Sequence, residues 1–219
     1  FEARPEFRVY AMEIDGVAAA LDADIRNAVP LEFPLSSFDI EIDTVRSAIS
    51  NLEAVKSASV RIRPGGILQV RVHPRTPVVI WRSWDGLKMI DIDGVAVAPL
   101  AARMDRPDLP LIAGLGADKH VKEALDLYLA VAPLGTRLRG IQRMGERRWD
   151  IVLDRGQRIL LPETGALQAL ERVIALDAAQ DVLSRDIARV DMRLQARPTV
   201  KMNPYATAEW WTIQTLSSQ

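Results

Sequence analysis

The sequence predicts an α+β protein: a small β-α-α-β-β domain is followed by a larger β-rich domain with a mostly antiparallel sheet and a few helices. Two observations support this prediction. Near the N-terminus, two segments with helical spacing of apolar residues lie between segments whose apolar residues alternate. From Thr76 onward, short alternating runs separated by Asp-Gly pairs dominate, which is typical of hairpins. We expect domains at 6–75 and 76–202 and a C-terminal tail at 203–219.

The composition indicates a folded chain whose recognition surface is local. Of the residues, 48% are hydrophobic, and 28 Lys and Arg balance 29 Asp and Glu. This balance argues against a disordered chain and against a nucleic-acid binder. There is no cysteine, which excludes disulfides and thiolate chemistry. No apolar run is long enough to span a bilayer, and because the chain begins at Phe1 we expect a fragment, with any membrane anchor upstream of that residue.

The N-terminal domain is expected to begin with a strand and two helices. The strand covers residues 7–11 and is closed by a turn at Asp15-Gly16, a pair that suits positive φ. Residues 18–29 carry apolar side chains at four-residue spacing, which indicates a helix. A second helix is expected to follow Asp39 as N-cap, because apolar residues recur at three and four positions from Ile42 to Leu52.

Two alternating segments then predict a hairpin with one apolar and one basic face. The apolar positions are Ala58, Val60, Ile62, Leu68, Val70 and Val72. The turn is formed by Pro64-Gly65-Gly66, and the basic strip on the outer face consists of Arg61, Arg63, Arg71 and Arg75. We interpret this strip primarily as a solvated face, with anionic lipid or an acidic partner as the alternative.

The second domain is expected to be a meander with inserted helices. Strands are expected at 78–82, 88–92, 95–97, 149–153, 157–161, 188–194 and 199–202, with an irregular connector at 99–110. Helices are expected at 121–132, where Pro133 stops the helix, and at 163–176, with a further helical turn at 181–184.

The chain lacks the residue patterns that metal binding or catalysis requires. His73 and His120 are far apart and neither has another histidine or a cysteine at ligand spacing, so we predict no metal site. No glycine-rich phosphate loop or serine nucleophile elbow is present, and we predict no cofactor and no catalytic residue. Asp91 and Asp93 could form a carboxylate pair for cell-wall chemistry. A turn that requires Asp-Gly is the better interpretation.

Several short motifs occur in a recognisable order, at residues 55–61, 64–72, 75–81, 90–94, 109–114, 148–160 and 189–193. This order resembles the periplasmic region of FtsQ/DivIB cell-division proteins. There, a "V-x-x-A-x-V" strand, a proline-containing turn, an "L-x-V-x-V" strand and an "R-x-P-V-A-x-W" junction end a POTRA domain, and a β domain follows. Arg197-Pro198-Thr199 is most similar to alphaproteobacterial members.

The resemblance implies a non-enzymatic divisome scaffold. Family members are single-pass inner-membrane proteins whose periplasmic part binds FtsB, FtsL and other divisome proteins at the septum and helps regulate septal peptidoglycan synthesis. The alternative is a POTRA-containing translocation or outer-membrane assembly component, which would carry tandem POTRA repeats or a barrel in the full-length gene.

The resemblance also implies where partners bind. In the family, the exposed edge of the last strand accepts a strand from FtsB, helped by nearby basic residues. Carried onto this chain, these are Leu194, Ala196, Arg197, Thr199, Val200, Lys201 and Met202, with Arg147 and Arg148 as the basic neighbours. An open edge suits this role, because its unpaired N–H and C=O groups can bind a partner backbone. Pro198 fits an edge, since proline cannot donate to a central ladder.

Overall fold

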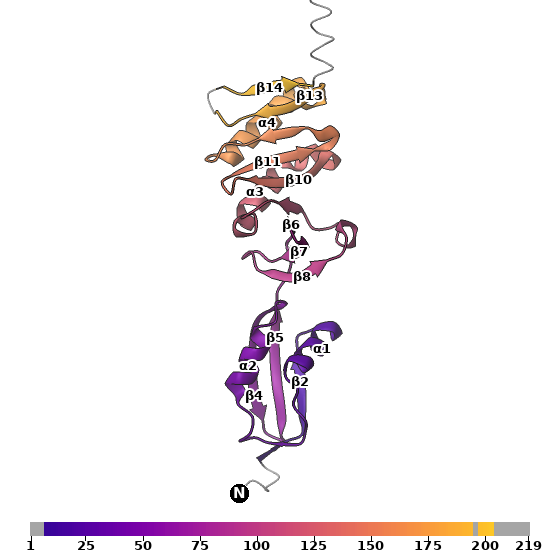
Figure 1. Ribbon diagram of the computed structural model, residues 1–219, viewed down its shortest axis with the longest axis vertical. Coiled ribbons are helices and arrows are strands. Elements are labelled where there is room, and N and C mark those ends of the chain that lie inside the picture. Colours follow the sequence, from indigo (N-terminus) through magenta and orange to yellow (C-terminus); the bar gives the residue numbers. More distant parts are fainter. Residues whose placement is uncertain (1–6, 195–196, 204–219) are drawn as a thin grey trace, which may run out of the picture. The chain divides into compact units, whose positions relative to one another are not determined.

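The protein has the α+β fold that the sequence predicts. The structure, a computed structural model, describes residues 7–194 and 197–203 (Figure 1). The described residues form two compact units. The first comprises residues up to Pro77 together with Val95–Ala98, and the second comprises Val78–Gly94 and the residues from Pro99 onward.

The first unit is built on a three-stranded sheet with strand order β2-β5-β4. Its elements are β1 (Arg8–Val9), β2 (Ala11–Asp15), α1 (Ala19–Ala28), β3 (Leu35–Ser36), α2 (Ile42–Ser50), β4 (Val55–Arg63) and β5 (Ile67–Pro74). β2 runs parallel to β5, β4 and β5 form the expected antiparallel hairpin, and β1 pairs with β3. Ile25 and Ile49 from the two helices and Leu68 from β5 are fully buried in one core.

Two predicted details of this unit are wrong. The first strand is broken in two at Tyr10, because the Tyr10 N–H donates to the Gly66 carbonyl (2.7 Å) instead of to either sheet. The N-cap of α2 is Glu41 and not Asp39, whose N–H closes a turn onto the Ser36 carbonyl (3.1 Å). The helix therefore begins at Ile42, where the Glu41 carboxylate accepts a hydrogen bond from the Thr44 hydroxyl (2.8 Å).

The predicted basic strip is only partly right, because acidic side chains of β2 lie beside the arginines of the hairpin. Arg61 Nε donates to the Gln69 side chain (2.8 Å), and Gln69 in turn donates to Asp15 on β2 (2.7 Å). Arg63 lies 3.7 Å from Glu13, also on β2. The sequence could not show this because β2, which supplies both carboxylates, is separated from the hairpin by two helices but pairs directly with β5.

The second unit supplies most of a nine-stranded mixed sheet with the order β14-β13-β12-β11-β10-β9-β6-β7-β8, in which residues 96–98 of β8 are grouped with the first unit. Its strands are β6 (Val79–Ser83), β7 (Gly86–Ile90), β8 (Ala96–Leu100), β9 (Leu111–Ala113), β10 (Leu138–Met144), β11 (Arg148–Leu153), β12 (Arg158–Leu160), β13 (Ile187–Asp191) and β14 (Thr199–Met202). The pairs β6–β9, β9–β10 and β12–β13 are parallel, and the other registered pairs are antiparallel.

Two helices, α3 (Val121–Val131) and α4 (Ala166–Gln180), cover one face of this sheet. Trp149, Ile151 and Leu153 alternate along β11 and are fully buried in the same core as Leu127 of α3 and Leu170 of α4. Because side chains alternate along a strand, Asp150 and Val152 lie on the opposite face, where no helix packs in the described part of the chain.

The elements of the second unit follow the sequence prediction with several differences. β9 was not predicted, and the strand expected at 188–194 ends at Asp191. α4 begins three residues later than expected, after the left-handed Gly165, and extends to Gln180. β10 was not predicted, because Gly140 and a bulge between Leu138 and Gly140 interrupt the alternation of apolar residues. The connector at 99–110 contains the end of β8 and a short 3₁₀ turn, Arg103–Asp105.

Candidate partner-binding edge of the second sheet

The last described strand, β14, forms one end of the nine-stranded sheet (Figure 1). In the part of the chain that the structure describes, it pairs with β13 alone, and Val190↔Val200 and Asp191↔Thr199 are direct partners. All four residues of β14 are exposed. The predicted strand at 199–202 is therefore present, and its second edge carries backbone groups of the kind that pair with an added strand.

The two sides of β14 differ in chemistry. Val200 is the partner of the buried Val190 and lies on the helix-covered side with Met202. Both residues line a groove of about 400 Å³ that also involves Leu176, Val182 and Ile187. Thr199 and Lys201 lie on the opposite side, because their partners Asp191 and Arg189 lie there. The strand thus presents an apolar side and a polar side.

Leu194 and Arg197 lie in the loop between β13 and β14. Leu194 is 69% exposed. Together with Asp191, Arg193 and Thr199, these two residues line a pocket of about 350 Å³. Arg193 Nη2 donates to Asp191 (2.6 Å), and this guanidinium lowers the pKa of the Asp191 carboxyl. The predicted residue Ala196 lies outside the described residues.

Arg147 and Arg148 lie at the same end of the sheet as the start of β14 but not beside it. Three strand-to-strand steps separate β11 from β14, which is about 14 Å at the usual spacing. Arg147 is exposed in the turn before β11, and Arg148 is half-buried, with its Nε 3.7 Å from Asp150 Oδ1. A strand bound along β14 would need further residues beyond the paired segment to reach Arg147 and Arg148.

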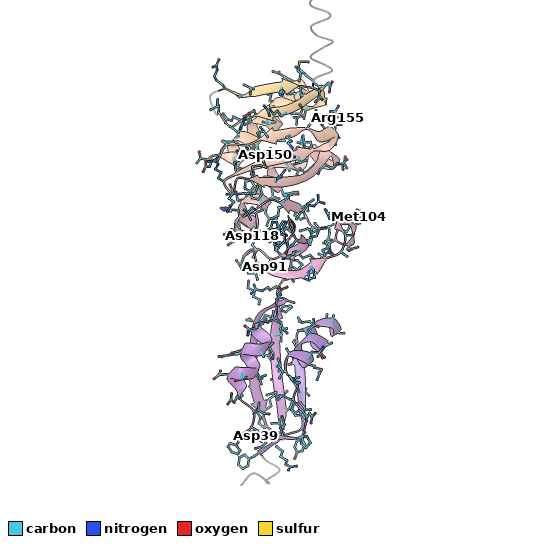
Figure 2. All side chains as sticks on the ribbon, in the orientation of Figure 1. Asp39, Asp91, Met104, Asp118, Asp150 and Arg155 are labelled. Carbon is cyan, nitrogen blue, oxygen red and sulfur yellow. The ribbon has the colours of Figure 1, made fainter. Side chains whose placement is uncertain are left out.

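Asp150 is a charged residue near this edge that sequence reasoning missed. Its side chain, labelled in Figure 2, is 3% exposed. Arg148 lies 3.7 Å and Arg158 3.8 Å from its carboxylate. Burial raises the pKa of the Asp150 carboxyl, and the charges of Arg148, Arg158 and Arg193 oppose this shift. Alternation along β11 places Asp150 on the face opposite Trp149 and Ile151 and does not show that it is buried. Only the register, which brings Leu160 and Asp191 alongside, accounts for its burial.

The other titratable groups considered from sequence are exposed or have local partners. His73 is exposed on β5, and His120 Nδ1 lies 3.4 Å from Glu123. Asp91 is buried, and its carboxylate accepts the Asp93 N–H (3.0 Å), which supports the turn interpretation. Within residues 7–194 and 197–203, no cluster of three or more His, Cys, Asp or Glu could hold a metal ion. None of the described helices is both long enough and apolar enough to cross a membrane.

Comparison with known proteins identifies the family. A family profile described as "Cell division protein FtsQ/DivIB, C-terminal" matches residues 79–193, which is most of the second unit. The chain belongs to the FtsQ/DivIB family. The predicted resemblance is thereby confirmed. β14, at 199–202, lies beyond the last matched residue, 193.

Curated FtsQ proteins from alphaproteobacteria are similar to nearly the whole chain. "Cell division protein FtsQ" of Roseobacter litoralis is 64% identical over 219 residues, which are 100% of this chain and 75% of that protein. The protein of the same name from Cereibacter sphaeroides is 49% identical over 206 residues, 94% of this chain and 67% of that protein. The protein of the same name from Paracoccus denitrificans is 50% identical over 199 residues, which are 91% of this chain and 58% of that protein. These names support a role in cell division and divisome partners in general, and not the alternative of a translocation component.

Proposed function

We propose that this chain is a non-enzymatic divisome scaffold that binds FtsB and FtsL in the periplasm by β-strand addition at β14. The observation that supports this proposal is the position of β14 at one end of the sheet with all four residues exposed. A backbone edge supplies hydrogen bonds to any extended segment, while alternate side chains supply selectivity. The relatives' names provide the cell-division context.

The chemistry of the edge indicates the kind of strand that it would accept. Val200 and Met202 would contact apolar side chains of the added strand on the helix-covered side, where the groove of about 400 Å³ is already partly apolar. Thr199 and Lys201 would contact polar or acidic side chains on the other side. Arg147, Arg148 and Arg197 at the same end of the sheet favour acidic residues at one end of the partner segment.

The proposed placement in the cell follows from the family. We place residues 6–75, a POTRA-like domain, and residues 76–202, the β domain, in the periplasm at the septum, with a single inner-membrane anchor upstream of Phe1. Capture of FtsB and FtsL there would let the chain regulate septal peptidoglycan synthesis without catalysing a reaction. The predicted tail at 203–219 lies, apart from Asn203, outside the described residues.

The test measures binding of an FtsB periplasmic peptide to the chain and to Val200→Asp and Met202→Asp. A charge on the apolar side of β14 should weaken binding at least about tenfold, because it would be desolvated against the added strand. Ser59→Asp, at an exposed strand position of the first unit, is the matched control and should bind like the parent chain. Unchanged affinity in both β14 variants would exclude this edge.

A second measurement separates strand addition from contact through side chains alone. Amide hydrogen exchange should show new protection along 199–202 when the FtsB peptide binds, because the outer amides would gain partners. Tight binding without such protection would mean that FtsB uses another surface.

A further inference from the structure

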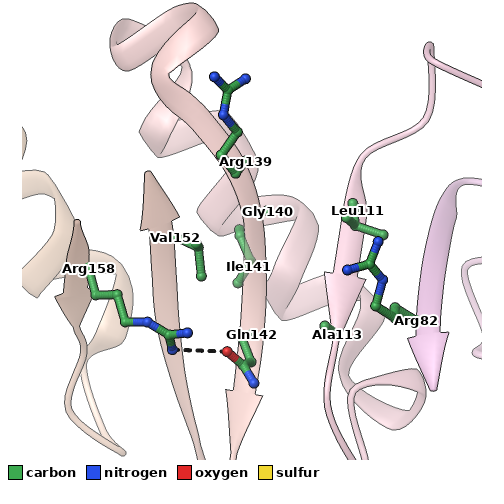
Figure 3. Close-up of a pocket in the computed structure, with 9 residues that line it drawn as sticks. All are labelled: Arg82, Leu111, Ala113, Arg139, Gly140, Ile141, Gln142, Val152 and Arg158. Carbon is green, nitrogen blue, oxygen red and sulfur yellow. Dashed lines mark hydrogen bonds between the residues drawn. The ribbon is translucent and has the colours of Figure 1, made fainter. Parts of the chain in front are cut away.

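The uncovered face of the second sheet contains a groove that the edge site does not use. Figure 3 shows it between β6 and β12, crossing the central strands β9, β10 and β11. Its volume is about 280 Å³. Gly140 lines the groove on β10, and a Cβ there would lie 3.1 Å from the Leu111 carbonyl oxygen, so only glycine lets β9 approach this closely.

The floor of the groove is apolar and its sides are basic. Leu111, Ala113 and Val152 contribute the floor. Arg82 on β6, Arg139 on β10 and Arg158 on β12 contribute the positive charges. None of the nine lining residues is acidic.

Two of these arginines are available for a ligand. Arg82 and Arg139 are exposed, and their guanidiniums make no hydrogen bond or ion pair with any residue that the structure describes. Arg158 donates to Gln142 (3.0 Å) and lies 3.8 Å from the buried Asp150. The groove therefore has an excess of positive charge that this chain only partly neutralises.

The spread of the arginines and the apolar floor between them indicate the kind of ligand that the groove binds. Arg82 and Arg158 lie on strands four steps apart, which corresponds to about 19 Å between their backbones. Arg158 Nη1 reaches Gln142 on β10, so its guanidinium lies two strands away from its own backbone. A phosphate or diphosphate would pair with guanidiniums but would leave the apolar floor uncovered. An extended peptide of several residues spans the groove and can place carboxylates near the arginines and an apolar side chain on the floor.

We propose that this groove docks an acidic segment of a partner protein, with carboxylates facing Arg82, Arg139 and Arg158 and apolar side chains between them. The site is independent of strand addition at β14, because the ligand would lie across the sheet face and not along its edge. The two contacts together would let one chain hold two segments. Arg189 and Lys201, which continue the face on β13 and β14, would extend the positive surface toward the edge.

The test titrates the 219-residue chain with a synthetic peptide of alternating glutamate and leucine and follows backbone amides by NMR. Shifts should concentrate at Ala113, Gly140 and Gln142, and the double variant Arg82→Glu/Arg139→Glu should bind at least about tenfold more weakly. Arg71→Glu/Arg172→Glu is the control, because it makes the same charge change at two exposed residues outside the groove and should alter affinity less than twofold.

Three outcomes would overturn the proposal. The first is equal binding by the groove variant and the parent chain, and the second is a set of shifts confined to other residues, β14 included. The third is displacement of the peptide by equimolar inorganic diphosphate with the same shifts, which would make the groove a small-anion site. Loss of binding in the groove variant, with FtsB-peptide binding retained, would establish the groove as separate from the edge.

Discussion

Arg143 and Trp149 are direct cross-strand partners on β10 and β11, and the guanidinium carbon lies 4.9 Å from the centre of the Trp149 ring. Both side chains point to the helix-covered face, where Trp149 is fully buried. Arg143 Nη1 also donates to Glu123 on α3 (2.7 Å). A buried cation is thus held between an aromatic ring and a carboxylate, and it connects the helix to the middle of the sheet.

Removal of the carboxylate should destabilise the second unit. Glu123→Ala leaves the Arg143 guanidinium, which is 5% exposed, without its ion pair, and we expect a loss of about 1–3 kcal/mol in unfolding free energy. Lys122→Ala, next in the helix, removes only an exposed pair at 3.9 Å and should cost less than about 0.5 kcal/mol. Denaturant unfolding followed by tryptophan fluorescence reports on this unit, because all five tryptophans lie in its sequence. Equal costs for the two variants would contradict the role given to Arg143.

Gly94 should be intolerant of a side chain. It has φ +81, and a Cβ there would overlap the carbonyl oxygen of Asp118. Gly94→Ala should therefore cost several kcal/mol, the sum of left-handed strain of about 1–2 kcal/mol and displacement of the 116–120 turn. Gly156→Ala, with φ +73 and open space around its Cβ, isolates the strain and should cost about 1–2 kcal/mol. The difference between the urea unfolding midpoints of the two variants measures the cost of the clash with Asp118. Equal midpoints would show that the 116–120 turn adjusts without cost.

Tyr128 should make stability depend on pH in alkaline solution. Its hydroxyl accepts the Leu111 N–H (2.9 Å) and donates to the Leu111 carbonyl (2.5 Å), and burial raises the pKa of Tyr128 to about 12. Because the folded-state pKa is above the unfolded value of 10.0, the phenol's contribution is complete below pH 10 and is lost as pH rises toward 12. Tyr128→Phe should lack this alkaline loss and be less stable by about 1–2 kcal/mol at pH 7. If the unfolding free energies of the two proteins changed in parallel above pH 10, Tyr128 would not be the group responsible.

Asp150 should change stability with pH in the opposite direction to an ordinary salt-bridged carboxylate. Burial raises the pKa of its carboxyl above 3.8, so its contribution to stability is largest when it is protonated and is lost as pH rises through the folded-state pKa. Asp150→Asn keeps the shape but cannot ionise, and its stability relative to the parent chain should therefore increase as pH is raised from about 3 to 7. Thermal unfolding across this range provides the measurement. A relative stability of the Asn variant that falls with pH would mean that the arginine charges outweigh desolvation.

Much of the fold could be predicted because its signals are local. The helix at 121–132 and the hairpin from Trp149 appear in the structure within a few residues, since apolar periodicity depends only on neighbours in sequence. β14 was predicted at its observed bounds for the same reason. β10 was missed because its alternation is interrupted at Gly140, and the Asp39 cap was wrong because a turn competed for that residue.

The candidate site was predicted less completely than the fold. The motifs indicated β14 and the arginines at 147–148, but not that three strand spacings separate them. The groove around Gly140 depends on β9 and the surroundings of Asp150 depend on β13, and both strands are distant in sequence from the residues they meet.

By itself, the amino-acid sequence determined the family, the α+β class and the succession of strands and helices, because these follow from motif order and from apolar spacing within short segments. Only the tertiary structure decided which strands are neighbours. Strand order placed β14 at an end of the sheet, brought the acids of β2 to the arginines of β4, and gathered Arg82, Arg139 and Arg158 around one hollow. The physical reason is that hydrogen-bonded register between distant segments sets which side chains share a face, and no periodicity within a single segment encodes it.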